Sequence, residues 1–480
     1  MISATRQRSA KRPVKPVASV PSASEALLPF DWPLANEAEQ FLRQRIGLFL
    51  ERNSFARQLA DCMRDETGTD FFEWVDHLVL LPGEEKALSA VGFVRDPRTE
   101  TPNGEAVYEH PRATLPRVLL RRGPSVIALR PEFVADFMAS HNLCGEPEGE
   151  PCSRYRRIVV AKESGTRLEA VERRAYRGFV PASLKPGELS RIIKARELWR
   201  TRPRQFANDA EGFKPANRIL DRVLGLVRRD LACQFLFEAE RTYWENRSRA
   251  ARIQKHRQDR LGLGWGNHDH HTFRCSRGHF VDLVEFLLKL GFAKRERYYA
   301  GAEAGWGAQV CEQPATGIVV FADVDLLPEE TQIDFSKHKL PPALHLGTVG
   351  LWVGLHGESF LQAGMHHLEA RFDFDLLRDQ LKEAGVNTMK PFSDFPFLRQ
   401  AFTVGERWPV CPERLERLLS AGLITREQFD QFSGEGALGS HLENLQRHGG
   451  YKGFNQQAVS VVIAATDPRK HHFCQPPAAA

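Results

Sequence analysis

With 480 residues, of which 42% are hydrophobic and 10% aromatic, the chain is long enough for two or three domains, and its composition excludes disorder throughout. Its 66 basic and 61 acidic residues nearly cancel, so the net charge of +5 provides little electrostatic attraction for nucleic acid. No run of roughly 18 apolar residues could span a bilayer, and the eight cysteines include no C-x-x-C pair, so we expect a cytoplasmic protein with reduced, mostly structural thiols.

Residues 1–33 form a tail rich in Ser, Ala and Pro, in which five Lys or Arg residues precede the first carboxylate, Glu25. A transit peptide would require an amphipathic helix, which Pro13 and Pro16 disfavour. We therefore predict a disordered basic tail here. A second flexible tail is expected at 471–480.

Residues 34–185 are predicted to form an α+β unit. A helical pattern covers about 34–66, and a strand at Trp74–Leu80 leads into a short helix that ends near Gly92. Further strand-like runs follow between 105 and 173. The order of these patterns predicts a sheet with helices on it.

Residues 186–260 are predicted to be helical and are rich in arginine. One apolar stripe has the spacings of three and four residues that are typical of an amphipathic helix; it comprises Leu220, Val223, Leu224, Val227, Leu231 and Phe235. The basic face of this segment raises nucleic-acid binding as an alternative, but Glu238, Glu240 and Glu245 interrupt it. A solvated helix face packed on a core is the preferred interpretation.

Residues 261–470 are predicted to form a domain of two βαβββ modules. The first has a strand at His268–Arg274, a helix at Phe280–Leu290, and three strands near 295–299, 306–311 and 317–321. The second starts at Met365 with a strand, continues with a helix at Leu376–Ala384, and has strands near 399–403 and 459–465. Both modules therefore have the same order of a strand, a helix and further strands.

A histidine lies at the start of each repeated unit. His77, His270 and His367 occupy equivalent places, each before a helix that ends in Gly-Phe or Gly-Val. Repetition of this size indicates a modular fold, and paired βαβββ modules resemble the vicinal oxygen chelate superfamily, in which two modules curl into a half-open barrel around one metal. The predicted class is therefore α+β, with a helical segment between the N- and C-terminal parts. The N-terminal unit is interpreted as a degenerate module, because Leu81 stands where the first C-terminal module has Arg274.

The strand at 268–274 presents a polar face. Side chains alternate along a strand, so His268, His270, Thr272 and Arg274 share one side. Four residues at roughly 3.3 Å each separate Arg274 from His270 by about 13 Å, which leaves space for an anionic substrate. A lone histidine is more often structural than a ligand, but His367 at an equivalent strand start favours metal ligation by both.

A carboxylate is expected as the third ligand. Two imidazoles and one carboxylate on one side of iron leave positions open for a chelating substrate and dioxygen. Glu443 is the preferred candidate, because the period of two places it on one face with His441. Glu435 and Glu369 are the competitors, and each could instead be a surface carboxylate or a group that orients a ligand histidine.

Three segments resemble a known family. The segment DHHTFR at 269–274 resembles the Asp-His-x-x-Phe-Arg motif of the 2-oxoadipate dioxygenase/decarboxylase family, whose members belong to the vicinal oxygen chelate superfamily. The segment LRQAFTV at 398–404 is similar to that family's Leu-x-Gln-x-Ser-Thr-Val, and 439–447 is similar to its Gly-Ser-Tyr-Ile-Glu-Phe-x-Glu-Arg strand. Phe402 replaces the family serine, a helical insertion follows Val404, and the first 200 or so residues have no counterpart. These departures affect the substrate more than the metal.

The resemblance implies that His270, His367 and Glu443 bind Fe²⁺ and that Arg274 holds a substrate carboxylate. It further implies a dioxygenase and decarboxylase that converts a small 2-oxo acid, similar to 2-oxoadipate, and O2 into a hydroxy acid and CO2. Gln400 is assigned either to substrate orientation or to a strand edge. Thr272 and Arg371 are further candidates for substrate contact, and His366 and His441 for orientation of the ligands.

Three other functions fit these residues. An extradiol ring-cleaving dioxygenase uses the same ligand set, so the metal alone does not distinguish a catechol from a 2-oxo acid, although Arg274 favours an anionic chain. The same side chains could hold Zn²⁺ in a hydrolase. In a nucleic-acid-binding module, the basic tail and the arginine-rich helices would contact phosphates and the histidines would be structural; the mixed charge of the helices argues against it.

Overall fold

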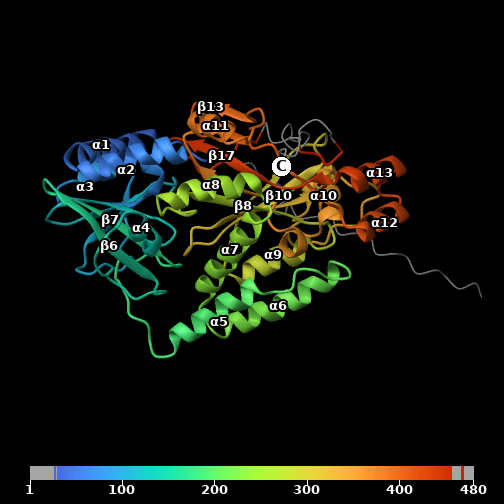
Figure 1. Cartoon of the computed structure of the whole chain (residues 1–480), viewed down its shortest axis with the longest axis horizontal. Coiled ribbons are helices and arrows are strands. Elements are labelled where there is room, and N and C mark those ends of the chain that lie inside the picture. Colours follow the sequence, from blue (N-terminus) through green and yellow to red (C-terminus); the bar gives the residue numbers. More distant parts are fainter. Residues whose placement is uncertain (1–25, 29, 457–465, 470–480) are drawn as a thin grey trace, which may run out of the picture.

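Two large mixed β-sheets, a two-stranded sheet and the helices around them form the described part of the chain (Figure 1). This part comprises residues 26–28, 30–456 and 466–469 of a computed structural model. The predicted α+β class, with repeated modules on either side of a helical segment, is confirmed. Most of the predicted basic tail, the strand predicted at 459–465 and the tail at 471–480 lie outside the described residues. Within the described ranges, no helix has the length and apolar character needed to cross a membrane.

An eight-stranded sheet contains both C-terminal modules in the order β13-β14-β17-β12-β8-β11-β10-β9. In each module the last strand lies parallel to the first, β11 beside β8 and β17 beside β12, and the two first strands pair antiparallel at the centre of the curled sheet. The first module consists of β8 (His268–Arg274), α9 (Phe280–Lys289), β9 (Ala293–Tyr299), β10 (Trp306–Glu312) and β11 (Val319–Asp325). The second consists of β12 (His367–Arg371), α11 (Phe374–Glu383), β13 (Ser393–Phe395), β14 (Leu398–Phe402) and β17 (His441–Arg447).

Two insertions extend these modules. Between them lie a 3-10 turn (Pro328–Gln332), α10 (Thr348–His356) and a π-helical turn (Ser359–Ala363). The predicted helical insertion after Val404 contains β15 (Arg407–Trp408), α12 (Pro412–Ser420), α13 (Arg426–Glu435) and β16 (Ala437–Leu438). Chain positions 402 and 441 are nevertheless close, because β14 and β17 are paired neighbours.

The N-terminal sheet has seven strands in the order β2-β3-β4-β1-β5-β7-β6. One complete module contains β1 (Val75–Leu80), α3 (Glu85–Ala90), β2 (Val94–Arg95), β3 (Ala106–Glu109) and β4 (Arg117–Leu120). A second, with one strand fewer, contains β5 (Ser125–Leu129), α4 (Val134–Ser140), β6 (Tyr155–Glu163) and β7 (Thr166–Arg173). Sequence reasoning recognised one repeat in this half, whereas the sheet contains two.

The N-terminal helical pattern divides into α1 (Asn36–Arg52) and α2 (Ser54–Cys62). Asn53 lies between them in an extended conformation, and its side-chain oxygen accepts a hydrogen bond from the backbone N–H of Ala56. This is the geometry of a helix N-cap, which starts a new helix where the sequence pattern continues.

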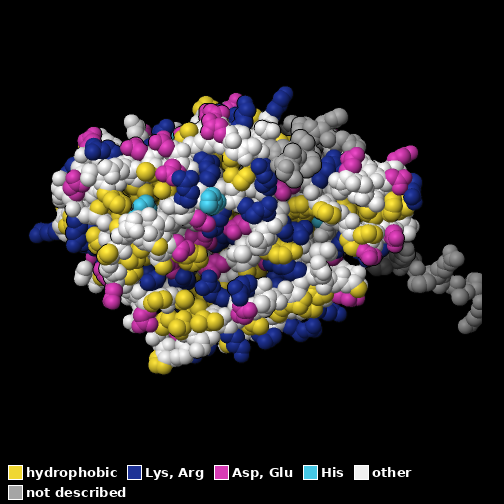
Figure 2. All heavy atoms as spheres, in the orientation of Figure 1, with side chains coloured by type: hydrophobic (Ala, Val, Ile, Leu, Met, Phe, Trp, Pro, Cys, Tyr) yellow, Lys and Arg dark blue, Asp and Glu magenta, His cyan; other side chains and the backbone are white. Residues whose placement is uncertain are grey.

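Four helices connect the sheets: α5 (Glu188–Arg200), α6 (Ala210–Leu224), α7 (Arg229–Glu245) and α8 (Arg249–Arg260). The apolar stripe predicted as one helix is therefore divided, since α6 ends at Leu224 and α7 begins at Arg229. Gly225 follows the end of α6, and glycine is a poor helix former. Lys and Arg side chains are interspersed with Asp and Glu over the face shown in Figure 2, so the structure presents no field of one sign there.

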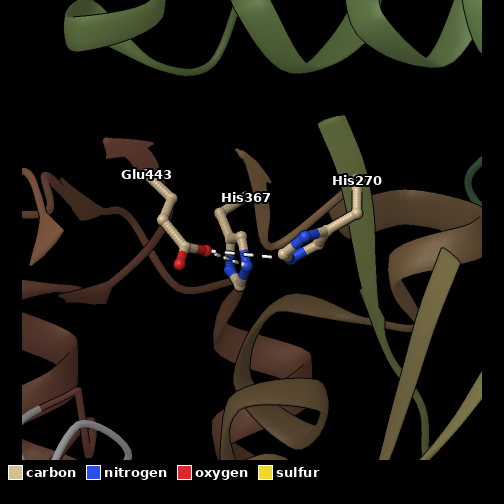
Figure 3. A group of neighbouring side chains, drawn as sticks. All are labelled: His270, His367 and Glu443. Atoms are coloured by element: carbon tan, nitrogen blue, oxygen red, sulfur yellow. Dashed lines mark ion pairs between the residues drawn. The ribbon is translucent and has the colours of Figure 1, made fainter. Parts of the chain in front are cut away.

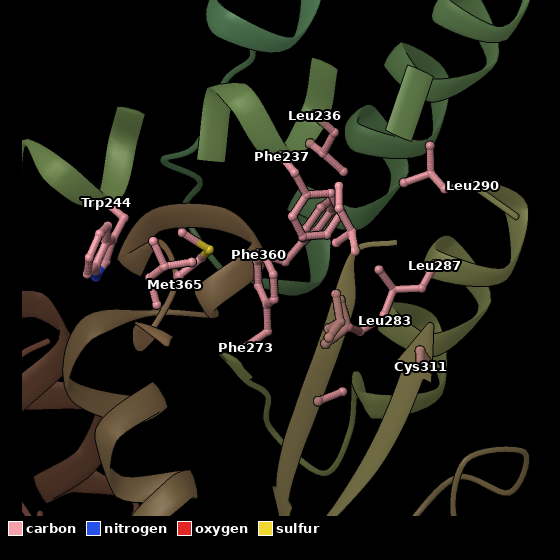
Figure 4. Packing of buried hydrophobic residues seen from close by; sticks show 14 of the residues in the cluster. Leu236, Phe237, Trp244, Phe273, Leu283, Leu287, Leu290, Cys311, Phe360 and Met365 are labelled. Carbon is pink, nitrogen blue, oxygen red and sulfur yellow. The ribbon is translucent and has the colours of Figure 1, made fainter. Parts of the chain in front are cut away.

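The largest core joins these helices to the C-terminal sheet. Phe237 of α7 lies against Phe273 of β8 with ring centroids 6.0 Å apart, and Leu283 and Leu287 of α9 belong to the same cluster (Figure 4). Each fully buried side chain of this size contributes about 1.5–3 kcal/mol. Because Phe273 faces the helices, its neighbours Thr272 and Arg274 point to the opposite, concave side of the sheet.

Candidate metal centre

Three side chains from three strands converge on the concave face of the C-terminal sheet. His270 comes from β8, His367 from β12 and Glu443 from β17, and all three are buried. Their nearest ligand atoms lie within 4.8 Å of one another, with 3.0 Å from His367 Nε2 to Glu443 Oε2 and 3.8 Å from His270 Nε2 to the same oxygen (Figure 3). Two imidazole nitrogens and one carboxylate oxygen at this spacing suit a divalent metal.

Neighbouring groups hold the ligands in this orientation. His270 Nδ1 is 2.8 Å from Glu369 Oε1, and the Nδ1 atoms of His367 and His366 are 2.9 Å apart. Both Nε2 atoms therefore point toward Glu443. Gln400 donates through Nε2 to Glu443 Oε1 at 3.1 Å and to Glu369 Oε2 at 2.8 Å. Such outer contacts set the tautomer and the direction of a metal-binding ring.

The register of β12 and β17 separates the competing carboxylates. Glu369 and Glu443 are direct neighbours across this parallel pair, and Glu369 lies on the Nδ1 side of His270. Glu435 is at the end of α13, where it pairs with Arg407 at 3.3 Å and its side chain is 54% exposed. The structure therefore places Glu443 with both Nε2 atoms and Glu435 away from them.

Burial and neighbouring charges shift the pKa values of all three candidate ligands. Burial raises the pKa of Glu443 well above its usual range, and the neighbouring Glu369 raises it further. Burial lowers the pKa of His367 well below the usual value, and His270 acts in the same direction. Burial alone would lower the pKa of His270, but Glu369 and Asp269 outweigh it and raise that pKa to about 9. A divalent cation at the common point would compensate the charge of Glu443.

A second group of possible ligands, Asp269, His270 and Glu369, lies on the other side of the His270 ring. Arg447 already occupies it: its Nη2 atom is 2.8 Å from Asp269 Oδ2 and 3.3 Å from Glu369 Oε1. Because the Arg447 guanidinium neutralises Asp269 and Glu369, these two carboxylates orient His270. The group of His270, His367 and Glu443 is therefore the candidate metal centre.

A cavity of about 70 Å³ adjoins the three ligands. Arg274 lines it and is buried; its Nη2 atom donates to Thr466 Oγ1 at 3.2 Å, whereas Nε and Nη1 have no hydrogen-bond partner among the described residues. Burial lowers the pKa of Arg274 to about 10. A buried cation with two unpaired donors beside a metal centre is suited to an anionic ligand.

The remaining predicted site residues separate into two groups. Thr272 and Gln400 line the cavity, and the Thr272 hydroxyl is 2.9 Å from His367 Nε2. Arg371 instead pairs with Glu73 at 3.4 Å and lines a different cleft, between the two sheets. His441 lies behind the ligands, with Nδ1 2.8 Å from the carbonyl oxygen of Thr403.

Sequence reasoning missed Asp323 and Arg447. Asp323 is buried in the cavity wall, next to Arg274 across the β8–β11 pair, and burial raises its pKa to about 7. The available signal was the alternation of Val319, Phe321 and Asp323 toward one face of β11. For Arg447 the available signal was the arginine that ends the family strand to which 439–447 is similar, although the sequence did not show its partners, Asp269 and Glu369.

The N-terminal sheet repeats part of this arrangement. His77 Nδ1 is 2.7 Å from Asp76 Oδ2, and Arg173 Nε is 2.7 Å from Asp76 Oδ1, matching Asp269, His270 and Arg447 in their respective strands. Two residues after His77, Val79 pairs with Val126, whereas in the C-terminal sheet Thr272 pairs with His367. A valine thus stands at the place of the second imidazole. Phe179 packs on the His77 ring at 4.8 Å and fills the space.

No family model and no curated protein matches the chain. Among solved structures, a mutant of 4-hydroxymandelate synthase from Streptomyces coelicolor matches at 13% identity, with a TM-score of 0.28, over 82% of this chain and 98% of that one. The YdcJ protein of Shigella flexneri, which includes domain DUF1338, matches at 13% identity, with a TM-score of 0.24, over 54% and 73%. Methylmalonyl-CoA epimerase from Mycobacterium tuberculosis matches at 13% identity, with a TM-score of 0.22, over 38% and 88%. Likeness at this level supports no statement about activity, which has to be argued from the site itself.

Proposed function

We propose that the protein is an Fe²⁺-dependent dioxygenase and decarboxylase that acts on a small 2-oxo acid, with His270, His367 and Glu443 as the metal ligands. The observation that carries the proposal is the position of Arg274: this buried cation, with two donors that are unpaired among the described residues, lines the same cavity as a two-histidine, one-carboxylate group. Bound Fe²⁺ would supply open positions for a chelating 2-oxo acid and for dioxygen.

The residues of the cavity would bind and orient the substrate. Arg274 presents Nε and Nη1 to a substrate carboxylate, a bidentate contact that a lysine reproduces poorly. The Thr272 hydroxyl and the Gln400 amide lie beside the ligands, where they can hold the keto acid end. For a substrate such as 2-oxoadipate, addition of O2 and loss of CO2 leave a hydroxy acid with one carbon fewer.

The aromatic lining excludes water from this reaction space. Tyr298, Trp306, Phe321, Phe392 and Phe454 line the cavity, and few polar groups face it apart from those already described. A dry site strengthens the attraction between Arg274 and a carboxylate. The same lining favours an aryl substrate, so ring cleavage of a catechol is the second candidate function.

Metal analysis and oxygen uptake test the proposal together. Protein purified without oxygen should contain one iron per chain, and His270→Ala should lose it; the exposed surface variant His256→Ala is the matched control. Oxygen uptake should follow addition of 2-oxoadipate or 2-oxoglutarate, with release of CO2. Uptake with catechols alone would select the second candidate, and full iron content in His270→Ala would refute the ligand assignment.

A further inference from the structure

A wide cleft lies between the two sheets. Its volume is about 610 Å³, within the range of about 300–1,000 Å³ that is usual for small-molecule sites. The N-terminal sheet contributes Arg117, Arg130 and Arg173 to one wall, and the C-terminal sheet contributes Arg371 and Arg447 to the other. Guanidinium groups therefore line both walls of one cleft.

Most charges of this lining are compensated. Arg173 pairs with Asp76 at 2.7 Å, and the other cations of the lining except two have a carboxylate within ion-pair distance. The two exceptions among the described residues are Arg117 and Arg130. The cleft thus carries two positive charges that have no carboxylate partner in the described part of the chain.

Both arginines are partly buried, and few protein groups compensate their charges. Arg117 donates through Nη1 to the carbonyl oxygen of Arg177 at 2.5 Å and lies over the Phe179 ring at 4.5 Å. Arg130 is half-buried, and its guanidinium has no hydrogen-bond or ion-pair partner within the part of the chain that the structure describes. Burial lowers the pKa of Arg117 to about 9 and also lowers that of Arg130, for which nearby cations, Arg173 first among them, act in the same direction. Uncompensated cations in such surroundings are costly unless an anion joins them.

We propose that the cleft binds a small polyanion, such as a phosphate ester or a polycarboxylate, through Arg117 and Arg130. Arg117 pairs with His77 on one side of β1, and the backbone N–H of Arg130 donates to the carbonyl oxygen of Trp74 on the other side of that strand. Both arginines therefore line the cleft from neighbouring strands, and one ligand with two negative charges can meet both. Arg371 faces them from the opposite wall; its only ion pair is a long one, 3.4 Å to Glu73, and its Nε atom has no partner among the described residues. The planar guanidinium fork matches phosphate and carboxylate oxygens.

This site is next to the metal centre and does not coincide with it. The cleft and the small cavity share His270, Phe321, Gln400 and Phe454 as lining residues, whereas Arg117 and Arg130 line the cleft alone. The degenerate N-terminal sheet thereby has a role: it forms the anion-binding wall opposite the candidate catalytic sheet. The inference is independent of the proposed reaction, because it needs neither iron nor oxygen.

Isothermal titration of the full-length protein with pyrophosphate and with citrate tests this site. Wild type should bind at least one of the two saturably, and Arg130→Gln should weaken that binding by about tenfold or more. Arg218→Gln, on the exposed face of α6 and outside the cleft, should leave it unchanged. Preference for pyrophosphate would assign the site to phosphate esters, and preference for citrate to polycarboxylates.

Two results would overturn the inference: absence of saturable binding to either probe, or equal affinity in wild type and in a folded Arg130→Gln protein. Arg117→Gln provides a second variant on the same wall if the first one fails to fold, and it should weaken binding to a similar extent. Thermal unfolding of each variant shows whether the protein titrated is native.

Discussion

Replacement of Arg274 by leucine should reduce kcat/KM for a 2-oxo acid by about 10²–10⁴. Two donors of this guanidinium, Nε and Nη1, have no hydrogen-bond partner among the described residues. Each charge-assisted hydrogen bond to a substrate carboxylate contributes about 1.5–3 kcal/mol, so two contribute about 3–6 kcal/mol, and every 1.4 kcal/mol corresponds to about a factor of ten. Arg274→Lys retains the charge without the fork and should recover only part of the loss.

Oxygen uptake at a range of substrate concentrations measures this effect, and iron content is the control. Arg274 makes one side-chain hydrogen bond to the described protein, to Thr466, so the leucine variant should remain folded and retain its metal. Arg218→Leu is a control for the loss of a charge, because Arg218 is exposed on α6 and lines neither the cleft nor the small cavity. If Arg274→Leu kept kcat/KM within about twofold of wild type, the reasoning that assigns Arg274 to a substrate carboxylate would be wrong.

Three further outcomes are expected. Glu369→Gln should weaken metal binding by about 10–100-fold, because it loses the carboxylate that holds His270 Nδ1; competition with a chelator measures it, and unchanged affinity would contradict the orienting role. In metal-free protein, the pKa of His270 is raised from 6.5 to about 9. Protonated His270 therefore stabilises the folded state fully below pH 6.5, and the free energy of unfolding falls by about 3 kcal/mol as the pH rises to 9. Urea unfolding at both pH values should show this decrease, and its absence would contradict the pairing of His270 with Glu369. Asp76→Asn should lower the free energy of unfolding by about 3–5 kcal/mol, because it leaves Arg173 buried without its partner, while the iron content of folded protein stays unchanged; loss of the iron instead would show that the N-terminal sheet supports the metal centre.

The N-terminal half shows why sequence patterns identified only part of the repeat. His77 is visible as the counterpart of His270, but the second module of this sheet has Val126 at the place of His367 and lacks one strand. In β5 the position that corresponds to His367 is occupied by Val126, an apolar residue. No feature of the local sequence distinguishes a valine that replaces a lost ligand from an ordinary core valine. The match becomes visible only through the pairing of β1 with β5, which copies the pairing of β8 with β12.

Similarly, the division of the predicted stripe at Leu220–Phe235 into α6 and α7 depends on packing. The three- and four-residue spacing continues through Gly225, so periodicity alone extends one helix across it. Leu220 and Phe235 are buried in the same core although they belong to different helices. The point at which the helix ends and the chain turns therefore depends on which apolar helix faces pack against the core.

The amino-acid order alone determines the alternation that puts His270 and Arg274 on one face of β8. It also shows the repeated module in which His367 occupies the place equivalent to His270. These are local properties, because side-chain direction in a strand depends only on the parity of residue number. Only the tertiary structure shows that Glu443 lies near the Nε2 atoms of both histidines, that Glu369 lies on the Nδ1 side of His270, and that Glu435 is remote from them. Strands seventy residues apart take their register from burial across the whole sheet, which no short stretch of sequence contains.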